Sequence, residues 1–259
     1  MDNLQKISLP PQASLSSFED KEKCEMSHSS NQELANDGNL HLSYYLIYKN
    51  NELNVLLFAS NMSSSQPLLE TQLDIKFPDS FAVKILVDSG IELIGENSLS
   101  IPSLPATCSA VIVFNLNFTK HTVNMNLSGK SKYRMGNNKN TKQVVFNIPL
   151  SLKDIIRPTI MSVEEFSQNW KQHTHERKTN VPNSSLDNPE KFVTVAKKHL
   201  NGSMVKVINS EVLFVGRLIS QNKFFLIHAV VGLTLMLTIR TSDAFFTQEI
   251  TKYCQLVLK

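Results

Sequence analysis

The residues that most often carry out chemistry in proteins are few in this chain, and their spacing supports little of it. His173 and His175 are two positions apart, so on a helix they point to different faces and cannot share a metal ion. We interpret both as solvated histidines near a helix end. His228 lies in an apolar segment and is interpreted as a partly buried residue of a sheet, with a functional role as the alternative.

Short motifs that hold nucleophiles, phosphates or metals are also missing. The sequence contains no Gly-x-Ser-x-Gly elbow, P-loop, dinucleotide-binding fingerprint or His-Glu-x-x-His pair. The cysteines are far apart, with no metal or disulfide spacing, which favours a reducing compartment; they are Cys24, Cys108 and Cys254. We therefore predict a protein that is not an enzyme, with no catalytic residues, no metal and no cofactor.

Composition narrows the remaining classes. The chain has 259 residues, 41% of them hydrophobic, which suits one large or two small packed domains. A net charge of +3 is too small for a dedicated nucleic-acid binder. No segment approaches the roughly 18 apolar residues of a membrane span, and the N-terminal residues lack the apolar core of a signal peptide. We expect no nucleic-acid partner and no membrane-spanning segment.

Trp170 stands out as the only tryptophan of the chain. Upstream of it, Ser162 and Glu165 have the spacing of a capping box, and Met161 can contact Phe166 across the first helical turn. The pattern predicts a helix that starts at Ser162 and runs to about residue 173. A lone tryptophan on such a helix is either a plug at the junction of two domains or a binding hot spot. The sequence leaves both interpretations open.

Three regions position this helix. Residues 1–38 are polar and predicted to be a disordered leader, because they bury too little apolar surface to offset ordering. Residues 39–150 show period-two alternation, which predicts an antiparallel, immunoglobulin-like β-sandwich. The alternating sets are Tyr44, Leu46 and Tyr48; Leu73, Ile75 and Phe77; Ile112, Phe114, Leu116 and Phe118; and Val144, Phe146, Ile148 and Leu150.

Residues 151–259 mix helical and strand patterns. After the Trp170 helix we predict a polar loop from Thr174 to Leu186, and a second helix that opens at Asn188-Pro189 and ends before Gly202. Strands are predicted at about 203–208, 211–219, 224–231 and 233–240, and Ser242 is predicted to cap a final amphipathic helix. The expected fold class is therefore α+β, a sandwich followed by a small platform with helices on an antiparallel sheet.

The last predicted strand has two different faces. Its core face consists of Leu233, Leu235, Leu237 and Ile239, and its other face of Thr234, Met236, Thr238 and Arg240. If helices cover the first face, the second is open. An exposed methionine beside threonine and arginine suits an adaptable peptide-binding surface, with an ordinary solvated face as the alternative.

Two stretches resemble a known family. Ile148-Pro-Leu-Ser-Leu followed by Arg157-Pro-Thr-Ile-Met-Ser-Val-Glu-Glu-Phe-Ser-Gln-Asn-Trp-Lys-Gln resembles the junction of sandwich and platform in large-subunit appendage (ear) domains of heterotetrameric adaptor protein complexes. Leu237-Thr-Ile-Arg-Thr-Ser and the helix after it resemble the end of the same domain. The resemblance covers about residues 39–259. It is strongest to the epsilon subunit of the fourth adaptor complex, with the alpha type of the plasma-membrane complex next.

The resemblance implies a function. Such appendages recruit accessory proteins through short linear peptides during sorting of membrane proteins at the trans-Golgi network. The chain would be the C-terminal piece of a longer subunit, with residues 1–38 as its hinge, on the cytoplasmic face of that membrane and its vesicles. Its partners would be the rest of the adaptor complex and an epsin-related accessory protein of the tepsin type.

The family's platform site is built round the tryptophan that matches Trp170. Met236 stands where the alpha type has an arginine, and His228 and Val230 replace a strong basic and acidic pair, so the resemblance implies an apolar, aromatic-rich ligand. The candidate peptide-binding residues are Phe166, Trp170, His228, Val230, Met236, Thr238 and Arg240. The alternatives are a structural spacer without a ligand and a weak membrane-surface module that uses Lys197 and Lys198.

Overall fold

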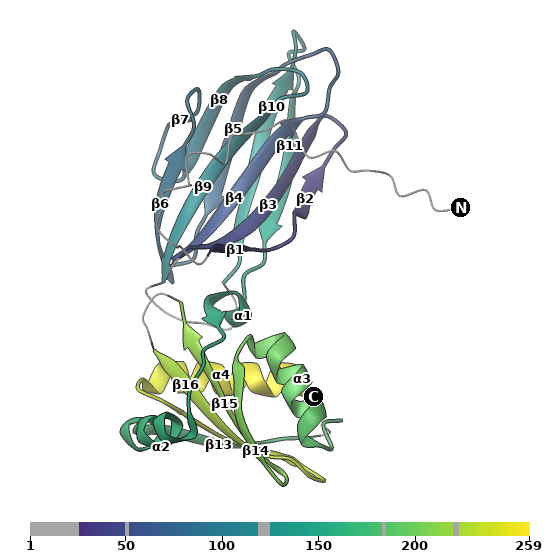
Figure 1. The fold of residues 1–259 in the computed structure, drawn as a ribbon. Helices are drawn as coiled ribbons and strands as arrows, with labels where there is room; N and C mark the ends of the chain where they lie inside the picture. The colour runs from purple at the N-terminus through teal and green to yellow at the C-terminus, as the bar shows by residue number, and fades with distance from the viewer. Residues whose placement is uncertain (1–25, 50–51, 119–124, 183–184, 220–222) are drawn as a thin grey trace, which may run out of the picture. The chain divides into compact units, whose positions relative to one another are not determined.

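The computed structural model describes residues 26–49, 52–118, 125–182, 185–219 and 223–259. Within these residues the chain forms two compact units, one made mainly of residues up to 148 and the other mainly of residues from 149 onwards. Figure 1 shows the first as layers of strands and the second as a sheet with helices. That each unit is an independent domain stays a prediction.

The first unit is an antiparallel β-sandwich, as predicted. One sheet has the order β1-β3-β4-β9-β6, with β2 also paired to β3: β1 (Met26–His28), β2 (Gln32–Asn36), β3 (Leu40–Lys49), β4 (Glu52–Asn61), β9 (Ser109–Phe118) and β6 (Phe81–Val87). The other has the order β11-β10-β5-β8-β7: β11 (Thr141–Ile148), β10 (Leu127–Met135), β5 (Leu68–Lys76), β8 (Ser98–Leu104) and β7 (Glu92–Leu93).

Alternation along these strands buries one side of each sheet. The buried side chains include Leu42, Leu57 and Phe114 from the first sheet and Leu73 and Phe146 from the second. Each strand contributes every second residue to this buried side, which is the pattern that predicted a sandwich. The opposite face of the first sheet also carries apolar side chains, among them Leu56 and Val113, which are buried as well.

The predicted disordered leader, residues 1–38, includes residues that form strands. Its residues 26–36 are not wholly disordered but contain β1 and β2, both paired antiparallel to β3. Asp37 then anchors the turn into β3: its carboxylate accepts the Leu40 amide at 2.9 Å and the hydroxyl of the buried Tyr133. Polar composition concealed these strands, because edge strands gain stability from backbone pairing without burying both faces. Residues 1–25 lie outside the described residues.

The second unit is a mixed platform, again as predicted. Its sheet has the order β12-β15-β16-β17-β13, with β14 also paired to β15: β12 (Ile156–Arg157), β15 (Glu211–Leu218), β16 (Phe224–Val230), β17 (Leu235–Thr241), β13 (His175–Val181) and β14 (Ser203–Ile208). The helices are α1 (Leu152–Ile155), α2 (Val163–Gln172), α3 (Pro189–Leu200) and α4 (Ala244–Val257). The long helices α3 and α4 bury apolar side chains and contact the strands of this sheet. Figure 1 shows α4 running behind the strands.

Strand β13 corrects a prediction, because residues 174–186 are not simply a polar loop. His175–Val181 pairs along its length with β17 and forms an edge of the sheet. Six of its seven residues are exposed or half-buried, so it has no apolar alternation for sequence analysis to detect. Charged side chains on an edge strand also hinder pairing with another chain.

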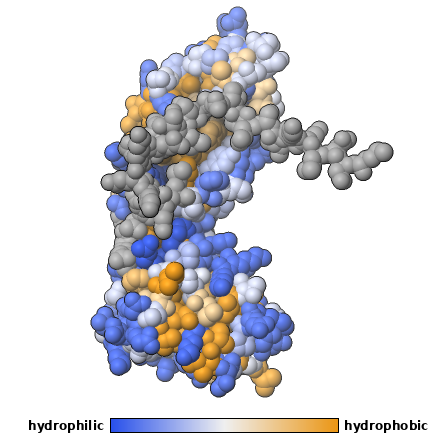
Figure 2. Space-filling model, in the orientation of Figure 1, coloured by the Kyte–Doolittle hydropathy of each residue, from blue (hydrophilic) through white to orange (hydrophobic). Residues whose placement is uncertain are grey.

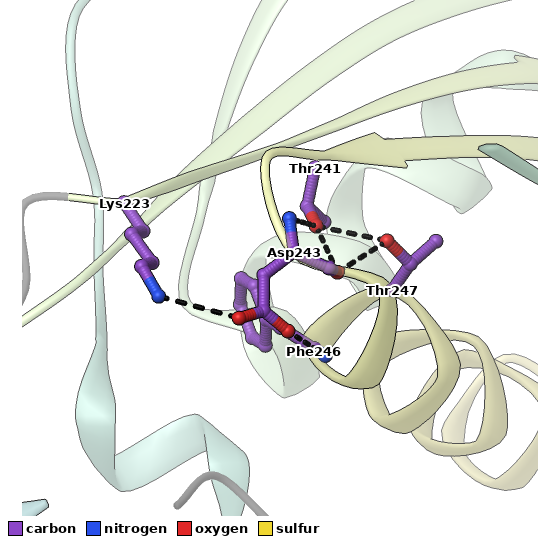
Figure 3. A network of polar contacts seen from close by, with 5 residues as sticks. All are labelled: Lys223, Thr241, Asp243, Phe246 and Thr247. Carbon is purple, nitrogen blue, oxygen red and sulfur yellow. Dashed lines mark hydrogen bonds and ion pairs between the residues drawn. The ribbon is translucent and has the colours of Figure 1, made fainter. Parts of the chain in front are cut away.

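Two further predictions in this unit were wrong by small margins. Leu233 is fully exposed in the turn before β17 and does not belong to the core, whereas Leu235, Leu237 and Ile239 are buried as expected. The cap of the final helix is Asp243 and not Ser242 (Figure 3). Asp243 accepts the Phe246 amide at 2.8 Å, and its own amide donates to Thr241 Oγ1 at 2.9 Å.

Replacing Asp243 by alanine is expected to lower the free energy of unfolding by about 0.5–2 kcal/mol, the usual cost of losing a helix cap. Ser242→Ala is the matched control and should leave stability nearly unchanged, since the Ser242 side chain is not the one that caps α4. Urea denaturation of both variants measures the difference. A larger loss in Ser242→Ala than in Asp243→Ala would contradict the assignment.

The contribution of Asp243 should also depend on pH. The hydrogen bond from the Phe246 amide, aided by the Lys223 ammonium 3.4 Å away and opposed by partial burial, holds the pKa of Asp243 below its usual value of 3.8. A lowered folded-state pKa means that the stabilisation is fully present above about pH 5 and is lost as pH falls through the folded pKa. The stability gap between wild type and Asp243→Ala should therefore narrow on acidification below pH 4.

Candidate functional site

Helix α2 lies where its capping box predicts. Ser162 Oγ accepts the Glu165 amide at 3.1 Å, and the Ser162 amide donates to Glu165 Oε2 at 2.7 Å. The helix ends at Gln172, with His173 as its C-terminal cap. His173 is not solvated as we predicted: it is buried, and its Nδ1 lies 2.7 Å from the Asn169 carbonyl. His175 is exposed, in agreement with the prediction.

The apolar side of α2 packs on the sheet. Phe166 is buried together with Val215 of β15 and Leu226 of β16. Partly buried side chains complete this cluster around them: Met161, Trp170, Val205, Leu213 and Phe224. Met161 and Phe166 thus meet in one cluster, which is the contact that the capping pattern predicted.

Trp170 is half-buried at the edge of this cluster. Its ring stacks on Phe166 with centroids 5.5 Å apart and meets the edge of His228 at 6.3 Å. The Arg240 guanidinium lies 4.7 Å from the centroid of the indole, a cation–π distance. Within the second unit the indole therefore has one packed side and one accessible part, an arrangement typical of aromatic binding hot spots.

Arg240 is held by several hydrogen bonds. Its Nη1 donates to the Trp170 carbonyl at 2.7 Å. Its Nε and Nη2 donate to Glu176 Oε2 at 2.7 Å and 2.6 Å, from the opposite position on β13. The guanidinium thus fastens the C-terminal turn of α2 to two strands of the sheet, and its charge is matched by a carboxylate.

Beyond Trp170 two rows of side chains cross the sheet on the same face. Directly paired residues place Leu213, His228, Thr238 and Lys178 in the first row and Glu211, Val230, Met236 and Asn180 in the second. We call these eight residues the open face. All of them are exposed or half-buried, and Met236 is 45% exposed.

At the centre of the open face Val230, Met236 and Thr238 are uncharged, whereas the charged residues Glu211 and Lys178 lie at its ends. His228 Nε2 lies 2.9 Å from Glu211 Oε2, so the one imidazole next to Trp170 is paired with a carboxylate. In Figure 2 hydrophobic surface gathers on the side of the second unit turned towards the viewer, where Figure 1 shows β14, β15 and β16 in front of α4. Glu211 is the single carboxylate among the eight residues of the open face.

The structure brings all the predicted site residues together in and around this face. Trp170 borders the open face, His228, Val230, Met236 and Thr238 belong to it, Phe166 supports the indole from below, and Arg240 lies beside it. That these residues bind a peptide stays a prediction.

Sequence analysis missed the contribution of β13 to the site. Glu176, Lys178 and Asn180 were assigned to a loop, yet strand pairing places them opposite Arg240, Thr238 and Met236. The period-two spacing of Glu176, Lys178 and Asn180 was a signal, but it is weak when both faces of a strand are polar.

Within the described ranges, no group of three or more His, Cys, Asp or Glu side chains is placed to hold a metal ion. A search of the helices in the same residues finds none that is long and apolar enough to cross a membrane.

Comparisons with known proteins find similarity to one family. Residues 158–257 match the family model described as the adaptin AP4 complex epsilon appendage platform. The chain is 22% identical to AP-4 complex subunit epsilon-1 of Mus musculus, over 100% of this chain and 22% of the relative. It is 24% identical to the Homo sapiens subunit of that name, over 97% of this chain and 21% of the relative. The chain therefore spans about a fifth of the length of these curated relatives.

Two similar solved structures are GAE domains. That of yeast GGA1 is 17% identical with a TM-score of 0.36, and the match covers 47% of this chain and 98% of the other. That of GGA2p from Saccharomyces cerevisiae is 16% identical with a TM-score of 0.31, and the match covers 46% of this chain and 98% of the other. The predicted resemblance to adaptor-complex appendage domains, and to the epsilon subunit of the fourth adaptor complex in particular, is confirmed by the family model and the curated relatives, with residues 158–257 matching the platform part of that family.

Proposed function

We propose that the platform unit is a non-catalytic recognition module that binds short, extended, aromatic-rich peptides on the open face beside Trp170. The observation that carries this proposal is the position of the indole, which is half-buried against Phe166, His228 and Arg240. The indole borders the open face, whose central residues Val230, Met236 and Thr238 are uncharged. A tryptophan held in this way offers a rigid aromatic surface at little entropic cost.

The charges of the site support a ligand without acidic anchors. Arg240 and His228 each already contact a glutamate, Glu176 and Glu211, and Met236 adds an uncharged, adaptable surface. An apolar or aromatic side chain can displace water from Met236 and Val230 without breaking an ion pair. Affinity for a single peptide should be weak, about micromolar or −8 kcal/mol, since a short peptide loses conformational freedom on binding.

The family match supports the wider role. We infer that the chain is the appendage of an adaptor-complex large subunit and recruits accessory proteins, including one of the epsin-related tepsin type, through linear motifs in their tails. The sorting step would take place on the cytoplasmic side of the trans-Golgi network and its vesicles, and membrane contact would be indirect. Many copies on one coat would give retention by avidity despite weak single contacts.

The decisive experiment selects binders from a library of random peptides and measures them on two methionine variants. Met236→Asp should weaken every aromatic peptide that wild type binds by about tenfold or more, because it puts a charge where an apolar anchor is desolvated. Met204→Asp is the matched control: Met204 is 39% exposed but pairs with Phe214, whose side chain is buried on the other side of β15.

Titrations followed by the fluorescence of Trp170 give these affinities directly, since it is the only tryptophan. Equal losses in Met236→Asp and Met204→Asp, or peptides that bind without changing the emission, would place the ligand elsewhere. A library that yields no binder at all would support the structural-spacer alternative.

A further inference from the structure

The charged group nearest to Trp170 is not free to meet a ligand. Three N–H groups of Arg240 already donate, one to the Trp170 carbonyl and two to the Glu176 carboxylate. Hydrogen bonds between a guanidinium and a carboxylate are among the strong ones in proteins. An acidic side chain of a ligand would have to compete with Glu176 for this cation.

Glu176 is well placed to hold this position. It lies directly opposite Arg240 in the pairing of β13 with β17, and the side chains of Glu176 and Arg240 are only 30% and 27% exposed. The hydrogen bond from Arg240 lowers the pKa of the Glu176 carboxyl, so this group stays ionised near neutral pH. Its other oxygen, Oε1, lies 3.7 Å from Lys178 Nζ, so one carboxylate contacts two cations, Arg240 beside the open face and Lys178 within it.

We propose that Glu176 is a specificity-determining residue of the Trp170 site: by pairing with Arg240 and Lys178 it excludes peptides with acidic residues beside their aromatic anchors. The inference rests on the proposed function and adds to it the class of peptide that the site rejects. Like-charge contact and an already occupied partner both act against an acidic ligand, whereas a neutral ligand experiences neither. Removing the Glu176 charge should therefore change which peptides bind, and not only how tightly.

The test uses two short peptides, each with two phenylalanine anchors, one with aspartate beside each anchor and the other with asparagine there. Glu176→Gln keeps the size and hydrogen-bonding capacity of the side chain but frees the charge of Arg240. We expect its affinity for the aspartate peptide to rise about tenfold over wild type at low ionic strength, the effect of one charge-assisted hydrogen bond. The gain should shrink when salt is added, and the asparagine peptide should bind wild type and variant alike.

Glu70→Gln is the matched control. Glu70 forms the same kind of ion pair with Arg134, but in the sandwich, so this variant makes the same change in net charge outside the unit that contains Trp170. Combining Glu176→Gln with Arg240→Gln should remove most of the gain, because the new partner is then missing. The emission maximum of Trp170 shows whether the indole keeps its environment in each variant.

The outcomes separate this inference from the proposed function. If wild type binds the asparagine peptide but Glu176→Gln gains no more for the aspartate peptide than Glu70→Gln does, Glu176 does not set specificity, while the proposed function stands. If Glu176→Gln instead loses the asparagine peptide and shifts the Trp170 emission, Glu176 only positions the indole, and the inference is overturned. If neither peptide binds any variant, the proposed function fails and the inference fails with it.

Discussion

Trp170→Ser is expected to abolish detectable peptide binding while the platform stays folded. The indole provides the rigid aromatic wall between α2 and the open face, and serine leaves no surface there for an aromatic anchor. Loss of a hot-spot tryptophan typically costs at least about 2 kcal/mol, or some thirtyfold in affinity. From a micromolar starting point, such a loss puts the complex beyond the range of most titrations.

The fold should survive this change because the cluster under α2 has other members. Phe166, Val215 and Leu226 are buried without help from the exposed part of the indole, and the Ser162 cap is several residues away. Circular dichroism and the unfolding midpoint check this point. Unfolding of Trp170→Ser would make the indole a core residue and remove the basis for the proposed site.

Phe245→Ser is the matched control for losing a large exposed aromatic side chain. Phe245 is 47% exposed and lies on α4, the helix on the covered side of the platform sheet. Peptide binding measured by titration calorimetry should be unchanged in this variant. If both substitutions weakened binding equally, the effect would come from general loss of surface hydrophobicity and not from a site at Trp170.

Sequence patterns predicted the elements that have one buried face. Strands β3, β4, β5, β9, β11, β15, β16 and β17 each bury a row of alternate residues, and α3 and α4 bury residues three or four apart, so periodicity was visible in each. Strands β6, β7, β8 and β10 were not assigned from the sequence, and β7 buries no residue at all. The capping box also predicted where α2 begins, because Ser162 and Glu165 each accept the other's backbone amide at the spacing typical of a helix start.

Elements held by backbone pairing alone could not be predicted in the same way. Strands β2 and β13 lie at sheet edges, where hydrogen bonds to one neighbour suffice and side chains need not alternate. As a result, the alternation along β17 predicted Met236, Thr238 and Arg240 as site residues. Glu176, which lies opposite Arg240 on β13, was not predicted. Which charge neutralises Arg240 is decided by register between strands about sixty residues apart, and periodicity carries no information on register.

The end of α3 also combines a feature that the sequence predicted with a packing contact that it did not. Gly202 was predicted as the residue that stops the helix, and a glycine beyond a helix end commonly takes the left-handed conformation. In the structure Asn201 takes that role, with φ at 46° and ψ at 37°. Gly202 is needed for a different reason: a Cβ built on it would lie 2.4 Å from the ring of Phe214 and 2.5 Å from the Val215 carbonyl oxygen.

Gly202→Ala should therefore destabilise the platform by about 1–3 kcal/mol, the usual cost of forcing an extra methyl group into a packed interior. The ring of Phe214 can shift only against other buried side chains, and the Val215 carbonyl is fixed by the sheet. Because Val215 also lies under Phe166, the strain should reach the α2 cluster and weaken peptide binding as well. Chemical denaturation measures the first effect and titration the second.

Gly232→Ala provides the control for adding a methyl group at a glycine. No heavy atom lies within 4 Å of a Cβ built on Gly232, which sits in the exposed turn before β17. Since alanine restricts the unfolded chain more than glycine does, this variant should be neutral or slightly more stable. A Gly202→Ala protein as stable as Gly232→Ala would show that α3 and β15 can separate enough to admit a methyl group, and that Gly202 is then only a residue at a helix end.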